Sequence, residues 1–250
     1  MRSGPIQVLR PSPCAVAVER KPTLLIAGAT GALGNEVLRR LVGVQRFDTA
    51  QVLAREPVRA AMRGVAFTVV ASDSPAQWPP AQADVGVILF DPPRLFYQRE
   101  RALWTPRPEQ LPALAQWMRR SGVATLAIVL PHAQGRLPEA LKRGLASLDE
   151  QAVAALGFER LLLIRSAQKP AAAAAAGALP RVAHWMISIA RFMVPSSEQP
   201  VRAAKVAELV ALALQLAPPG THIAAPELVW RAAQGDMLET ARQWLGAEAC

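Results

Sequence analysis

Apolar residues along the chain alternate between short continuous runs and stretches with helical spacing. The continuous runs predict buried strands at Leu24–Ala27, Thr49–Ala54, Val65–Ala71, Asp84–Phe90, Val123–Leu130 and Arg160–Arg165. Apolar residues three or four positions apart predict helices between these strands, at 33–42, Pro108–Gly122 and Leu137–Leu156. Strands that alternate with helices are joined by right-handed crossovers, so the pattern predicts a parallel sheet.

The last third of the chain has a different pattern. An amphipathic stretch covers Arg181–Val194, after an alanine run at Ala171–Ala176 that carries no functional signal. Helical spacing returns at Ala203–Leu216 and Met237–Leu245, and a short strand is predicted at His222–Ala224. This part of the chain is therefore predicted to be mostly helical.

A glycine-rich turn lies between the first predicted strand and the first predicted helix. Gly28, Gly31 and Gly34 stand three residues apart in it. The first glycine permits a tight turn, the second leaves room for a phosphate, and the third lets the helix pack closely on the strand. Backbone N–H groups and the positive end of the helix dipole meet there, which suits a pyrophosphate. The candidate cofactor-binding residues are Gly28, Ala29, Thr30, Gly31, Ala32, Leu33 and Gly34.

At this turn, GATGALG, the chain resembles the short-chain dehydrogenase/reductase superfamily. It looks most like the extended and atypical branch, with its NmrA-like and Tat-interacting-protein-like NAD(P)-binding proteins. Similar segments follow at Phe47–Glu56, Asp84–Phe90, Gly157–Ala167 and Gln199–Leu214. The resemblance implies a Rossmann-type doubly wound parallel α/β sheet with a small C-terminal helical lobe. It also implies binding of NAD or NADP.

The sequence also gives an expected division of the chain, in which the arginines and prolines of residues 1–20 indicate an extension outside the fold. Residues 1–21 are expected to form a flexible extension, and residues 22–250 a single domain. Residues 22–132 would form its nucleotide half and residues 133–250 its substrate or lid half. Ligands in such sheets bind at the carboxyl ends of the strands.

Arg55 follows the second predicted strand, where the 2′-substituent of the adenosine ribose lies in this fold. An arginine there suits the 2′-phosphate of NADP, whereas an acidic residue would suit the free hydroxyl of NAD. The prediction is therefore NADP in preference to NAD. The alternative is a surface arginine at a strand end, and the neighbouring Glu56 favours that alternative.

The catalytic residues of the family are missing at the matching positions. Family enzymes use a tyrosine with a lysine four residues later, because the ammonium lowers the pKa of the phenol. Here those positions fall near Lys142 and Ala146, and Tyr97 is the only tyrosine of the chain. The family's serine falls at about Leu130-Pro131, which offers no hydroxyl. We therefore expect weak or absent dehydrogenase activity by the tyrosine mechanism.

Two other residues are candidates for catalysis in a rebuilt site. His132 follows the fifth predicted strand and titrates near neutral pH. Asp91 follows the fourth strand, where a carboxylate would repel a pyrophosphate. The alternative is that His132 caps a loop and Asp91 begins a turn before Pro92-Pro93. Function therefore stays open between an NAD(P)-binding protein with a degenerate site, an NADPH-dependent oxidoreductase rebuilt around His132, and a non-catalytic nucleotide-sensing scaffold.

Charge and cysteine content narrow the possible partners. The formal charge is +9, but 24 of the 28 basic residues are arginines scattered along the chain, so no specific nucleic-acid partner is expected. No apolar run is long enough to span a bilayer, and a lid helix is favoured over peripheral membrane contact for Arg181–Val194. Cys14 and Cys250 lack metal-site spacing and fit a reducing cytoplasm. The expected partner is an unidentified small-molecule substrate, and a homodimer is compatible with the sequence.

Overall fold

The computed structural model describes residues 20–58, 62–70, 72–94, 97–132, 147–167 and 201–246. Within them lies a seven-stranded sheet in the order β3-β2-β1-β4-β5-β6-β7, and every neighbouring pair is parallel. The strands are β1 Leu24–Ala27, β2 Ala50–Ala54, β3 Val65–Val69, β4 Val85–Leu89, β5 Thr125–His132, β6 Arg160–Ala167 and β7 Gly220–Ala224. The strand order reverses between β1 and β4, as in Rossmann-type folds. The predicted fold class is therefore confirmed.

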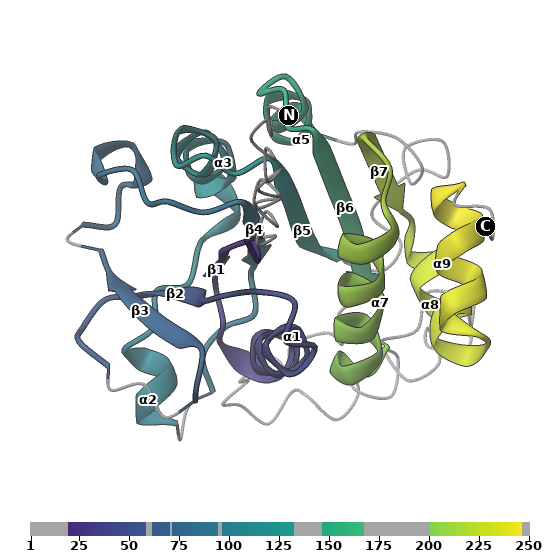
Figure 1. Cartoon of the computed structure of the whole chain (residues 1–250), viewed down its shortest axis with the longest axis horizontal. Helices are drawn as coiled ribbons and strands as arrows, with labels where there is room; N and C mark the ends of the chain where they lie inside the picture. Colours follow the sequence, from purple (N-terminus) through teal and green to yellow (C-terminus); the bar gives the residue numbers. More distant parts are fainter. Residues whose placement is uncertain are drawn as a thin grey trace, which may run out of the picture.

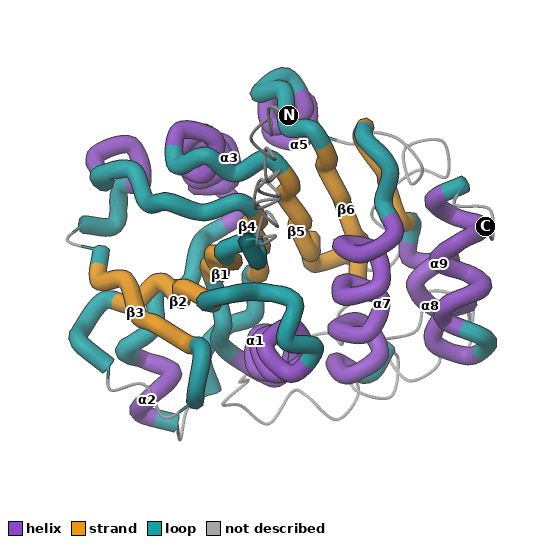
Figure 2. Tube along the Cα trace, in the orientation of Figure 1, coloured by secondary structure: helices purple, strands orange, loops and turns teal. Residues whose placement is uncertain are grey.

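Helices cover both faces of this sheet. The described helices are α1 Gly31–Gly43, α2 Gln98–Arg101, α3 Leu111–Arg120, α5 Leu148–Ala154, α7 Ala203–Leu216, α8 Pro226–Gln234 and α9 Met237–Leu245. Helices α1 and α7 lie side by side on one face, near α8 and α9, whereas α3 and α5 lie on the other (Figure 1). Figure 2 shows α2 as a short turn of helix within the long connection between β4 and α3.

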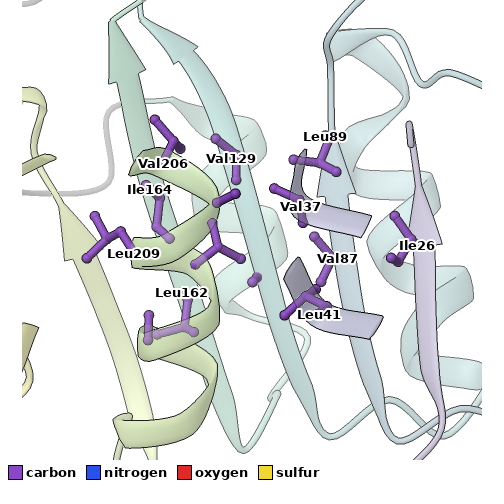
Figure 3. Packing of buried hydrophobic residues seen from close by; sticks show 14 of the residues in the cluster. Ile26, Val37, Leu41, Val87, Leu89, Val129, Leu162, Ile164, Val206 and Leu209 are labelled. Atoms are coloured by element: carbon purple, nitrogen blue, oxygen red, sulfur yellow. The ribbon is translucent and has the colours of Figure 1, made fainter. Parts of the chain in front are cut away.

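Alternation along each strand divides the apolar core into two layers. In β1, Leu24 and Ile26 belong to the layer under α1 and α7, whereas Leu25 and Ala27 belong to the layer under α3. Close packing of the first layer is visible in Figure 3, where side chains of β4, β5 and β6 meet those of α1 and α7. Both faces are buried, which explains why the central strands are continuous apolar runs rather than alternating ones.

Several element boundaries differ from the sequence predictions by one to a few residues, and two of the differences have a clear structural reason. Strand β5 does not end before Pro131 but continues to His132, which pairs with Ala167. Beyond Val129, β5 pairs in the sheet only with β6, so a residue without an N–H is tolerated on its other side. The predicted helix Leu137–Leu156 is not continuous, because Ser147 is extended and its hydroxyl accepts a hydrogen bond from the Glu150 N–H at 3.2 Å. Helix α5 therefore begins at this N-cap.

Several sequence predictions lie outside the described residues. These are the extension up to residue 19, the alanine run Ala171–Ala176 and the amphipathic stretch Arg181–Val194. The division into a nucleotide half and a substrate half stays a prediction. Within the described residues, no helix is long and apolar enough to cross a bilayer.

Gly34→Ala is predicted to destabilise the fold, whereas Gly43→Ala on the same helix is not. A Cβ at Gly34 would lie 2.5 Å from the Gly28 carbonyl oxygen, but at Gly43 nothing lies within 4 Å. Overpacking typically costs about 1–3 kcal/mol, and replacing an exposed helical glycine by alanine gains up to about 1 kcal/mol. Urea unfolding of both variants measures the difference. Equal stability of the two would contradict the close packing of α1 on β1.

Candidate functional site

The predicted glycine turn lies where the strand order reverses, at the carboxyl ends of β1 and β4. Gly28 and Gly31 have positive φ values of 83° and 68°. A Cβ at Gly28 would lie 2.0 Å from the Leu89 carbonyl oxygen, so only glycine fits between the two strands. The turn therefore has the shape that the sequence predicted, with the N-terminus of α1 facing the sheet edge.

The space above the second glycine is filled by the chain itself. A Cβ at Gly31 would lie 2.3 Å from Asp91 Oδ2 and 2.9 Å from the Pro92 carbonyl oxygen. Both atoms come from the connection that follows β4. We call its described residues, 91–94 and 97–107, the crossover segment. This segment lies at the place where a pyrophosphate approaches the turn in dinucleotide-binding folds.

Asp91 binds the first turn of α1 at two points. The Leu33 N–H donates to Asp91 Oδ2 at 2.9 Å, and the Thr30 hydroxyl donates to the Asp91 carbonyl oxygen at 2.5 Å. Thr30 is the N-cap residue of α1, but its side chain makes no capping bond of its own to the helix. Asp91 therefore supplies a helix cap from 58 residues away in the sequence.

Glu100 supplies a second carboxylate to the same helix end. The Gly31 N–H donates to Glu100 Oε2 at 3.0 Å, and Asn35 Nδ2 donates to Glu100 Oε1 at 2.8 Å. Arg94 binds the same carboxylate through its backbone N–H at 2.9 Å, through Nε at 2.8 Å and through Nη2. Glu100 is only 5% exposed. Five donors thus converge on one buried carboxylate.

These contacts shift the ionisation of both partners of the ion pair. Burial raises the pKa of Glu100, but hydrogen bonds from Arg94 and Gly31 and the charge of Arg94 outweigh it, so the pKa lies below its ordinary value. The hydrogen bond to Glu100 correspondingly raises the pKa of Arg94. Glu100 is therefore a carboxylate, not a carboxylic acid, at neutral pH.

The capping contacts follow from the composition of the first turn of α1. That turn contains no acidic residue, so it does not supply its own counter-charge. The free N–H groups at a helix start carry about half a positive charge and favour an anion. Asp91 and Glu100 satisfy two of these N–H groups and place two negative charges at the dipole. The start of α1 is therefore an anion-binding site that two carboxylates of the same chain occupy.

A third group of bonds fixes the far end of the crossover segment across the sheet edge. The Gly28 N–H donates to the Trp104 carbonyl at 3.2 Å, the Trp104 N–H to Leu53 at 3.0 Å, and the Arg55 N–H to Ala102 at 2.7 Å. The Trp104 side chain is 1% exposed and packs edge-on against Trp78, with ring centroids 4.8 Å apart. The crossover segment thus covers the ends of β1 and β2 as well as the glycine turn.

Arg55 and Tyr97 touch this network only at its periphery. Arg55 is half exposed, and its guanidinium lies 3.5 Å from Asp73 in a surface pair. Tyr97 is 53% exposed, and the Arg94 guanidinium lies 3.9 Å from its ring centroid. His132 ends β5, and its side chain, like Lys142, lies outside the described residues.

The sequence reasoning missed Glu100, Arg94 and Asn35. Glu100 and Gly31 are 69 residues apart, and no local pattern around Glu100 distinguishes it from a solvated charge. The one available signal was the missing acid in the first turn of α1. Such a turn leaves its free N–H groups to water, a ligand or another part of the chain.

Two further features lie away from the glycine turn. Arg165 and Glu150 form a buried ion pair of 2.7 Å between β6 and α5, with side chains 2% and 8% exposed. A cavity of about 400 Å³ lies at the opposite edge of the sheet and is lined by Lys21, Val42, Gly43, Gln45, Phe47, Ala50, Arg63 and Gly64. Among the described residues, no cluster of three or more His, Cys, Asp or Glu side chains could hold a metal ion.

Comparisons with known proteins give similar solved structures but no family for this chain. No protein-family model and no curated protein matches the chain. The enzyme WbmG of Bordetella bronchiseptica, solved with NAD, is similar over 94% of this chain and 91% of its own, with 11% identity and a TM-score of 0.47. The UDP-N-acetylglucosamine 4-epimerase of Bacillus cereus is similar over 85% of this chain and 82% of its own, with 13% identity and a TM-score of 0.44.

A third similar solved structure is also a nucleotide-binding protein by its description. A Rossmann-fold NAD(P)-binding family protein of Shigella flexneri is similar over 78% of this chain and 87% of its own, with 14% identity and a TM-score of 0.44. The Rossmann-type fold that the sequence resemblance implies is shown by the strand order of this chain itself. The NmrA-like branch is not specified by any of these structures.

Glu100→Gln is predicted to lower stability at neutral pH but much less in acid. A hydrogen-bonded charge of this kind contributes about 1–3 kcal/mol. Because the pKa of Glu100 is lowered by folding, its contribution is complete above the ordinary glutamate value of about 4.3 and is lost as the pH falls through the folded-state value. Urea unfolding of both proteins from pH 7 to pH 3 measures the difference. A difference that stays constant with pH would contradict an ionised Glu100 at the helix start.

Proposed function

We propose that this chain is a dinucleotide-binding protein of the short-chain dehydrogenase/reductase type that lacks tyrosine-based hydride transfer. The observation that supports binding is the glycine turn, in which Gly28 and Gly31 have positive φ values at the point where the strand order reverses. Rossmann-type sheets bind dinucleotides at that point.

The residues of the turn suit a pyrophosphate, provided that the crossover segment gives way. The N–H groups of Gly31 and Leu33 point out of the helix start toward bound carboxylate oxygens at 3.0 and 2.9 Å. Phosphate oxygens accept the same kind of hydrogen bond. A bound dinucleotide would supply hydride chemistry at its nicotinamide, while the chain would supply the anion-binding N–H groups.

Arg55 supports a preference for NADP. It directly follows β2, and its surface pair with Asp73 is long and exposed, so the guanidinium is held weakly. A phosphate on the adenosine ribose would form a stronger, bidentate contact. The proposed role of Arg55 is therefore to bind the 2′-phosphate.

The position of Tyr97 supports the lack of tyrosine chemistry. It is the only tyrosine of the chain, it is exposed, and its ring lies against the guanidinium of Arg94. Asp91 is engaged at the helix start, so a rebuilt site would depend on His132. General acid or base help of that kind contributes roughly 10²–10⁴-fold.

A non-catalytic scaffold that never binds a nucleotide is the second candidate. The specific observation that favours it is the occupation of the glycine turn by Asp91 and Glu100. Such a protein would use the Rossmann-type sheet only as a platform for other interactions. Nucleotide titration distinguishes the two candidates.

Nicotinamide fluorescence measures binding of NADPH and NADH to the wild type, Arg55→Ala and Arg63→Ala. Arg55→Ala is expected to weaken NADPH about tenfold, the size of one charged hydrogen-bond contact, and to leave NADH nearly unchanged. Arg63 is an exposed arginine at the opposite sheet edge and serves as the matched control. Equal losses for both cofactors would overturn the role of Arg55, and no binding to any of these variants would favour the scaffold.

Turnover of NADPH with a panel of aldehydes, ketones and quinones tests the chemistry. The wild type is expected to be weak or inactive, and Tyr97→Phe is expected to equal it. Robust activity that Tyr97→Phe abolishes would overturn the proposal. Activity that only His132→Ala abolishes would show a rebuilt site instead.

A further inference from the structure

We propose that the crossover segment is an autoinhibitory element, in which the carboxylates of Asp91 and Glu100 hold the positions that a pyrophosphate takes at the start of α1. This inference rests on the proposed dinucleotide binding, because it assigns a regulator to that same site. It adds one requirement: the carboxylates and a phosphate must compete for the N–H groups of Gly31 and Leu33.

The competition follows from the geometry of the two hydrogen bonds. The Gly31 N–H is bound to Glu100 at 3.0 Å, and the Leu33 N–H is bound to Asp91 at 2.9 Å. A phosphate oxygen cannot share these donors with a carboxylate, since like charges repel strongly at such a distance in a buried place. The Pro92 carbonyl and Asp91 also fill the space above Gly31. Binding therefore requires that the carboxylates leave.

Arg94 makes the exchange favourable once they leave. Its guanidinium is paired with Glu100 and remains 42% exposed, so a phosphate from solvent can reach it. A guanidinium binds phosphate with the same bidentate geometry as carboxylate. Displacement of Glu100 therefore does not leave the charge of Arg94 unpaired, because the incoming phosphate takes the place of the carboxylate.

The part of the segment that must move is bound to the helix start by the carboxylates of Asp91 and Glu100 and by the Thr30 hydroxyl, which donates to the Asp91 carbonyl oxygen. Glu100 is the buried residue of α2, and that helix has only four residues. Beyond it, backbone bonds of Ala102 and Trp104 fix the segment to Leu53, Arg55 and Gly28. The Thr105 hydroxyl also lies 3.0 Å from the hydroxyl of Thr30, the N-cap residue of α1. Opening therefore requires loss of the Glu100 and Asp91 contacts, while the tryptophan anchor stays in place.

Isothermal titration of the full chain with sodium pyrophosphate and with NADPH tests this competition. The variants are Glu100→Gln and Asp91→Asn, and Glu109→Gln is the matched control, because Glu109 is an exposed glutamate of the same connection. Removing one competing charge is expected to raise the affinity for both ligands about tenfold, since apparent affinity scales with the fraction of open sites. The control is expected to equal the wild type.

Each outcome decides the question, and the two proposals can fail separately. Unchanged pyrophosphate and NADPH affinities in both variants would overturn autoinhibition, and dinucleotide binding would stand if NADPH binds. A gain for pyrophosphate without binding of NADPH would support autoinhibition at the anion site and overturn the dinucleotide function. No binding of either ligand to the folded variants would overturn both. Asp91→Asn keeps an acceptor for the Leu33 N–H, so it carries the test if Glu100→Gln does not fold.

Discussion

The free N–H groups at the start of α1 are the constraint on which the candidate site depends. The start of a helix favours an anion, and this helix has no acid in its own first turn. The chain supplies Asp91 and Glu100 there, which come from the connection after β4. The course of that connection, the burial of Glu100 and the pairing with Arg94 all follow from this requirement.

The same contacts change the interpretation of Asp91 at the end of β4. From the sequence, Asp91 is a group that would repel a bound pyrophosphate. In the structure it takes the hydrogen bond that a phosphate oxygen would accept. The N–H groups of Gly31 and Leu33 are already bound, and charges of the same sign repel at such short distances, so the internal carboxylates and an external phosphate are alternatives at these donors. A Rossmann-type fold can thus keep its glycine turn while its occupant comes from within the chain.

The sequence predicts the fold more completely than it predicts the residues of the candidate site. Strand positions, the Rossmann order and the bounds of α7 and α9 follow from apolar periodicity, because burial on both faces leaves a strong local signal. Boundaries that depend on a single side chain are harder to predict, as Ser147 shows, because its hydroxyl caps the start of α5 inside the predicted helix Leu137–Leu156. Glu100 could not be predicted, since its partner at Gly31 is brought close only by the complete sheet.

Amide chemical shifts of Gly31 and Leu33 give the most direct test of internal occupation of the helix start. We expect the Gly31 N–H resonance to move strongly in Glu100→Gln, and the Leu33 resonance to move strongly in Asp91→Asn, because each N–H donates to one of these carboxylates. Glu109→Gln should leave both in place. If neither resonance responds to its own carboxylate, the helix start is not occupied by these two residues.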